Sequence, residues 1–69
     1  MSVTISVNGV EREATVATVA ELLRAENVDF GARYLAVAVN GAVVPRSTWQ
    51  DATISPGDAI EIVRPAPGG

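Results

Sequence analysis

Alternating apolar and polar side chains predict the first two elements of the chain. Residues 3–7 alternate with a period of two and are rich in β-branched side chains, which is typical of a half-buried strand. The pair Asn8-Gly9 follows, and this pair suits the two positive-φ positions of a type I′ turn. Residues 10–14 are therefore expected to return antiparallel as the second strand of a hairpin.

The apolar spacing changes to that of a helix after Thr18. Thr18 and Glu21 form a capping box, in which the threonine hydroxyl accepts from the amide of Glu21 and the Glu21 carboxylate reaches back to the Thr18 amide. One apolar stripe follows, formed by Val19, Leu22 and Leu23. Asn27 suits the left-handed position that ends a helix. A helix of about nine residues is unstable alone, so the stripe is expected to pack on a sheet.

A second hairpin is predicted in the middle of the chain. Residues 35–39 alternate large apolar side chains with alanines, which indicates a central strand. Asn40-Gly41 is a second turn of the same type, and it leads into a short strand at residues 43–44. Pro45 ends that strand, because proline has no amide hydrogen to donate to a ladder.

The last elements follow a single helical turn, predicted at residues 47–51. This turn carries Trp49, which is expected to cover one end of the core with its indole N–H bonded to a carbonyl. Residues 55–58 read Ser-Pro-Gly-Asp and predict a turn in which the glycine takes a left-handed conformation. Residues 59–63 alternate again, with isoleucines inward, and predict the last strand.

The order of these elements predicts an α+β fold. We expect a β-grasp, in which a mixed sheet of four to five strands carries one helix packed across one face. The last strand would pair parallel beside the first at the sheet centre. The other face would then be uncovered, and small residues there make it a candidate surface for docking a partner. The candidate docking residues are Ala36, Ala38, Glu61, Val63 and Arg64.

Composition narrows the functional classes. The 69 residues allow one small domain, predicted at residues 1–64 with a flexible tail at 65–69, and 48% hydrophobic residues argue against disorder. The chain has neither Cys nor His, and therefore no thiol nucleophile, imidazole base or soft metal ligand. We expect neither an enzyme nor a metal site.

Charge and hydropathy argue against two kinds of partner, nucleic acids and membranes. The net charge of −3 opposes binding to phosphate backbones, so no nucleic acid partner is expected. No apolar run approaches the roughly 18 residues of a membrane span, and no charged segment precedes the first strand. A cytoplasmic location without membrane binding is therefore expected.

The tail is a candidate functional site. Glycine has no Cβ, so a carboxylate on a diglycine can enter a narrow catalytic cleft of another protein. A stem that contains proline stays extended and away from the core. We therefore expect Gly69 to be functional. The tail residues of this candidate site are Ala66, Pro67, Gly68 and Gly69.

Several motifs together resemble the bacterial sulfur carrier proteins of thiamine thiazole biosynthesis. The Val-Pro-Arg-x-x-Trp run and the Gly-Gly pair are the most specific parts of this resemblance, which covers the whole chain. The motifs occupy residues 7–9, 19–23, 39–49, 57–62 and 68–69.

The resemblance implies a site and a set of partners. It implies that an ATP-dependent adenylating enzyme, similar to ubiquitin-activating enzymes, activates the Gly69 carboxylate. A sulfur donor, such as a cysteine desulfurase relay, would convert the adenylate to a thiocarboxylate, and thiazole synthase would take the sulfur. The carrier itself would bind no cofactor, because ATP is used by the partner enzyme.

Three other interpretations remain open at the level of sequence. The carrier of molybdopterin synthesis shares the fold, the Gly-Gly pair and a tail that contains proline. A ubiquitin-like modifier would be conjugated to lysines through Gly69. A non-covalent β-grasp binding module would carry its diglycine incidentally.

Overall fold

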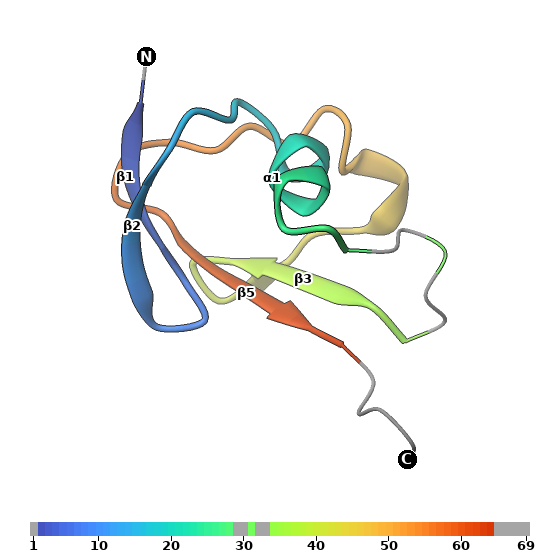
Figure 1. Cartoon of the computed structure of the whole chain (residues 1–69). Helices are drawn as coiled ribbons and strands as arrows, with labels where there is room; N and C mark the ends of the chain where they lie inside the picture. Colours follow the sequence, from blue (N-terminus) through green and yellow to red (C-terminus); the bar gives the residue numbers. More distant parts are fainter. Residues whose placement is uncertain (1, 29–30, 32–33, 65–69) are drawn as a thin grey trace.

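The described part of the chain contains five strands, one α-helix and one short 3-10 helix (Figure 1). The structure is a computed structural model, and it describes residues 2–28, 31 and 34–64. The elements in chain order are β1 (Val3–Val7), β2 (Val10–Ala14), α1 (Val19–Ala25), β3 (Ala36–Val39), β4 (Ala42–Val43), η1 (Arg46–Thr48) and β5 (Ala59–Val63).

The strands form one mixed sheet in the order β2-β1-β5-β3-β4, and α1 crosses one side of it (Figure 1). β1 pairs antiparallel with β2 and parallel with β5, with Ser6 opposite Ala59. β3 pairs antiparallel with both β5 and β4. The predicted β-grasp is confirmed, and β5 is its central strand.

Both Asn-Gly turns have the backbone conformation that the sequence predicts. The φ angles are 51° at Asn8 and 84° at Gly9, and 52° at Asn40 and 83° at Gly41. Positive φ at both central residues is the type I′ geometry, whose twist matches that of the flanking strands. The two hairpins are therefore set by local sequence.

The start of α1 differs from the prediction in one hydrogen bond. The Thr18 hydroxyl accepts from the Glu21 amide at 3.3 Å, as expected. The Glu21 carboxylate, however, accepts from the amide of Ala17 at 2.6 Å rather than from that of Thr18. An antiparallel bridge between Thr18 and Thr53 holds the entry to the helix extended, and this brings the Ala17 amide within reach of the carboxylate.

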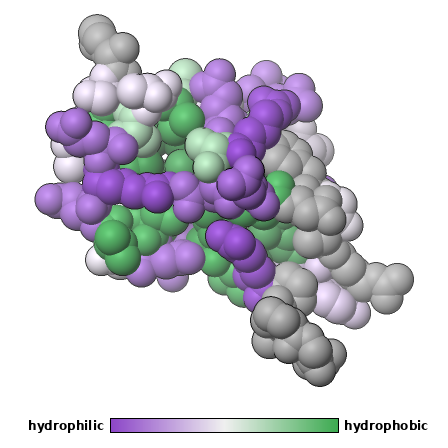
Figure 2. Space-filling view, viewed as in Figure 1, coloured by the Kyte–Doolittle hydropathy of each residue, from purple (hydrophilic) through white to green (hydrophobic). Residues whose placement is uncertain are grey.

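The helix is shorter than expected and is buried over a wider arc. α1 has 7 residues, and Asn27 follows it with φ of 57°, the predicted left-handed stop. Ala20 is buried beside the predicted stripe because η1 covers that side, where the Ala20 amide donates to the Trp49 carbonyl at 3.0 Å. In the view of Figure 1, apolar residues are visible at the surface between hydrophilic ones (Figure 2). The buried core consists of Ile5, Val7, Val19, Ala20, Leu22, Leu23, Val28, Leu35, Val37, Trp49, Ile54, Ile60 and Ile62.

Trp49 covers one end of this core. The residue is 2% exposed, and its indole N–H donates to the Val44 carbonyl at 2.9 Å. The Arg46 guanidinium lies 5.0 Å from the ring centroid. The preceding helical turn lies at Arg46–Thr48 rather than at the predicted residues 47–51, because the Thr48 and Trp49 amides each donate three residues back.

Substitution of Trp49 by phenylalanine is expected to lower the free energy of unfolding by about 1–3 kcal/mol, because the Val44 carbonyl loses its indole donor and the core loses volume. Urea unfolding would measure the change. The matched control is Tyr34→Leu, since Tyr34 is 68% exposed and its replacement should change stability by less than about 0.5 kcal/mol. Equal stability of the two variants would contradict the role given to Trp49.

Candidate functional site

The sheet face opposite α1 carries an apolar patch close to the end of β5. In the register of β3 and β5, Ala36 lies opposite Val63 and Ala38 lies opposite Glu61. Val43 on β4 lies opposite Ala38 and is 75% exposed, while Val63 is 59% exposed. Opposed residues on neighbouring strands point to the same face. We call Ala36, Ala38, Val43, Glu61 and Val63 the open-face patch.

The structure thus brings together four of the predicted docking residues and adds one. Val43 was not among the docking residues predicted from the sequence, although it lies two residues after the Asn40-Gly41 turn. Its pairing with Ala38 could have been predicted by counting back from that turn. Arg64 is exposed and lies immediately beyond β5, at the margin of the open-face patch.

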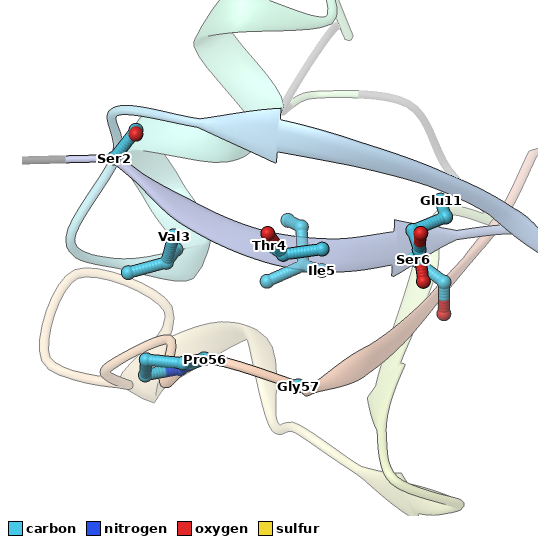
Figure 3. Close-up of a pocket in the computed structure, with 8 residues that line it drawn as sticks. All are labelled: Ser2, Val3, Thr4, Ile5, Ser6, Glu11, Pro56 and Gly57. Atoms are coloured by element: carbon cyan, nitrogen blue, oxygen red, sulfur yellow. The ribbon is translucent and has the colours of Figure 1, made fainter.

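The other half of the open face is polar. Glu11 on β2 lies opposite Ser6 on β1, and Glu13 lies opposite Thr4. A groove of about 420 Å³ opens here, where β1 parts from β5 (Figure 3). Its lining residues are Ser2, Val3, Thr4, Ile5, Ser6, Glu11, Pro56 and Gly57.

The groove has little capacity for catalysis. Glu11 is its one ionisable residue, and the other polar groups at the groove are hydroxyls and backbone groups. The Gly57 amide already donates to the Thr4 carbonyl at 2.7 Å across it. A nucleophile paired with a base is needed for covalent chemistry, and the residues that line this groove do not supply one.

A second groove, of about 280 Å³, lies between β2 and α1. An ion pair between Arg12 of β2 and Glu26 at the end of α1 lies along it, with side chains 38% and 21% exposed. This pair links the edge strand β2 to the end of α1, so both charges already have a partner within the fold.

The described part of the chain has neither a metal-binding cluster nor a membrane-spanning helix. Residues 2–28, 31 and 34–64 contain no group of three acidic, His or Cys side chains placed to hold a metal ion. Within the same residues, no helix has the length and apolar character needed to span a bilayer.

The predicted tail site, Ala66, Pro67, Gly68 and Gly69, lies outside the described residues. The structure describes the root from which this segment continues. β5 ends at Val63, and Arg64 follows it. We call Val63 the root of the tail, and it belongs both to the strand at the centre of the sheet and to the open-face patch.

The fold and the site define a class of protein: a small β-grasp domain with one open sheet face, whose central strand leads into a segment that contains Gly68 and Gly69. Residues 5–69 match the ThiS family model. The chain belongs to the ThiS family, the sulfur carrier proteins of thiamine biosynthesis. This is a family of carriers that work with the enzymes of that pathway.

Two solved structures support this assignment. The crystal structure of a thiamine biosynthesis protein (ThiS) from Geobacter metallireducens is 35% identical, covers 96% of this chain and 99% of that chain, and has a TM-score of 0.71. An NMR solution structure of a thiamine biosynthesis protein from the same organism is also 35% identical, with 96% and 87% of the two chains covered and a TM-score of 0.77. A comparison with curated proteins gives no match.

Proposed function

We propose that this chain carries sulfur as a thiocarboxylate on Gly69 and delivers it to thiazole synthase in the formation of the thiazole ring of thiamine. The observation that carries the proposal is the extent of the family match, which runs through residue 69 and so includes Gly68 and Gly69. The placement of the root supports it, because the segment follows a strand that is paired with β1 on one side and β3 on the other.

The proposed chemistry takes place in partner enzymes. A Gly69 carboxylate oxygen attacks the α-phosphorus of ATP in an adenylating enzyme, and pyrophosphate leaves. The outer sulfur of a persulfide, carried by a donor such as a cysteine desulfurase relay, then attacks the carbonyl carbon and displaces AMP, which gives an acyl disulfide. A thiol acts as the two-electron reductant: it attacks the donor's sulfur, forms a disulfide with it and releases the Gly69 thiocarboxylate. The carrier contributes an unhindered carboxylate and binds no cofactor, since ATP is held by the enzyme.

Intact mass spectrometry tests this function. The chain is incubated with the adenylating enzyme, ATP and a sulfur donor, and replacement of oxygen by sulfur should add about 16 Da. The thiocarboxylated chain should then lose this sulfur to thiazole synthase. Adducts on other proteins would indicate a ubiquitin-like modifier, and no mass change would indicate a non-covalent binding module. Sulfur transfer to molybdopterin synthase alone would place the chain in that pathway.

We also propose that the open-face patch docks the adenylating enzyme. The patch is apolar apart from Glu61. Its residue Val63 is separated from the tail at residues 65–69 only by Arg64, so an enzyme that takes up the tail must approach this part of the sheet. The net charge of −3 and the exposed Glu11 and Glu13 on the same face favour an apolar partner surface bordered by cations.

Val63→Asp is expected to raise the KM of the adenylating enzyme for this carrier by at least about tenfold, because a charge would be buried in an apolar contact. The measurement is ATP–pyrophosphate exchange at varied carrier concentration. Val10→Asp is the matched control, since Val10 is 65% exposed on edge strand β2, which β1 separates from β5, and the change adds the same charge. An equal effect of both substitutions would contradict docking at the patch.

A further inference from the structure

Asn8 joins two parts of the chain that are far apart in sequence. It is the first central residue of the hairpin turn that follows β1, yet its side chain contacts Ile62 in β5, 54 residues further on. The Asn8 Oδ1 atom accepts from the Ile62 amide at 2.8 Å, and the Nδ2 atom donates to the Ile62 carbonyl at 3.3 Å. Both polar groups of the Ile62 backbone are therefore bound by one side chain.

The Asn8 carboxamide extends the ladder between β1 and β5. In that ladder, the Ser6 amide donates to the Asp58 carbonyl at 3.0 Å, and the Asn8 amide donates to the Ile60 carbonyl at 2.9 Å. The main chain of β1 then turns away, with φ of 51° at Asn8. A carboxamide has the same donor and acceptor as a peptide group. It therefore stands opposite Ile62 in place of the next peptide group of β1.

Asn40 makes a comparable contact at the opposite end of β5. Its Oδ1 atom accepts from the Ala59 amide at 2.9 Å, and its Nδ2 atom donates to the Asp58 carboxylate at 2.9 Å. Each end of the central strand is thus bound by the asparagine of an Asn-Gly turn. Asn40 holds the start of β5, and Asn8 holds the end that continues into the tail.

The contact of Asn8 lies next to the root of the tail. On the side of β1, backbone pairing with β5 is described only as far as Val7 opposite Ile60. On the other side, β3 pairs with β5 as far as Val63. Beyond Ile60, β5 has no further backbone pairing with β1 among the described residues. There the Asn8 side chain binds the strand on its β1 side, through Ile62.

We propose that Asn8 is a positioning residue for the carrier reaction, which holds the end of β5 so that Val63 and the tail leave the sheet in one direction. This inference rests on the proposed function. Without the carboxamide, Ile62 would pair with water on that side, and β3 alone would hold the end of β5. The adenylating enzyme would then have to order the root as it binds, which weakens binding without altering chemistry at Gly69.

The test compares Asn8→Gly with Asn40→Gly. Glycine adopts positive φ readily, so each substitution removes a carboxamide while the turn is kept. ATP–pyrophosphate exchange by the adenylating enzyme is measured at varied carrier concentration. For Asn8→Gly we expect KM to rise by up to about tenfold, with kcat within about twofold of wild type. For Asn40→Gly both constants should stay within about twofold of wild type.

Amide hydrogen exchange supplies a readout that does not depend on the partner enzyme. In the wild-type chain, the Ile62 amide should be protected to about the level of the Ile60 amide. In Asn8→Gly the Ile62 amide should exchange faster, while Leu22 in the helix keeps its protection. An unprotected Ile62 amide in the wild type would overturn the proposal even if the variant failed to fold.

The kinetic outcomes separate this proposal from the proposed function. Equal rises in KM for the two glycine variants, no rise in either, or a fall in kcat at constant KM would overturn the positioning role of Asn8 alone. A wild-type chain that supports no pyrophosphate exchange would overturn the carrier function and, with it, the positioning role.

Discussion

Deletion of Gly69 is expected to abolish thiocarboxylate formation, and Gly69→Ala is expected to reduce adenylation by at least about 100-fold. Deletion moves the carboxylate back by about 3.3–3.6 Å, the length of one extended residue. Displacements of about 1 Å already cost about 100-fold when reacting atoms must be aligned. Alanine keeps the length but adds a Cβ and restricts φ, which a cleft shaped for glycine would not accept.

Two measurements check this expectation. ATP–pyrophosphate exchange reports adenylation, and intact mass reports the sulfur. The thermal midpoint serves as the control and should not change, because the buried core of the described residues is formed by side chains from Ile5 to Ile62. Unchanged exchange in both variants would remove the carrier hypothesis, since the carboxylate of Gly69 would then have no part in activation.

Leu22→Ala is expected to destabilise the domain by about 2–5 kcal/mol, enough to unfold most of it. Leu22 is 1% exposed and lies in the centre of the helix face that packs on the sheet. Truncation removes buried apolar surface and leaves a cavity, and a domain of 69 residues has few other contacts to compensate.

Urea unfolding followed by circular dichroism measures this effect. Arg24→Lys is the matched control, because Arg24 is exposed on the same helix and lysine keeps its charge with a similar helix propensity. We expect the control to change stability by less than about 0.5 kcal/mol. A melting midpoint for Leu22→Ala within a few degrees of wild type would contradict the packing of α1 described above.

Much of the local structure could be predicted because its causes act over a few residues. Alternating side chains determine β1 and β5, and the Asn8-Gly9 pair determines a turn whose φ angles follow from the residues themselves. The Thr18 cap also depends on a neighbour three residues away. The hydrogen bond of the Glu21 carboxylate was predicted wrongly. It accepts from the Ala17 amide rather than the Thr18 amide, because the bridge between Thr18 and Thr53 holds the chain extended there.

The candidate site was only partly predictable from sequence. Alternation placed Ala36, Ala38 and Val63 on one face, and the register confirms that they are neighbours. Val43 was missed because it lies in a strand of 2 residues, where alternation has no length over which to show a period. The role expected of Gly69 came from the Gly-Gly pair and the family resemblance, and it remains a prediction.

The sequence by itself determined the elements of this protein, the two turns and the inward faces of its helix and strands, because each depends on residues that are close along the chain. Only the tertiary structure decided the register in which the first and last strands meet. The parallel pairing of β1 with β5 sets Val7 opposite Ile60, and the contact of Asn8 with Ile62 depends on that register. Such a contact joins residues 54 positions apart. It exists only after the core has aligned the two strands, so no local pattern could have predicted it.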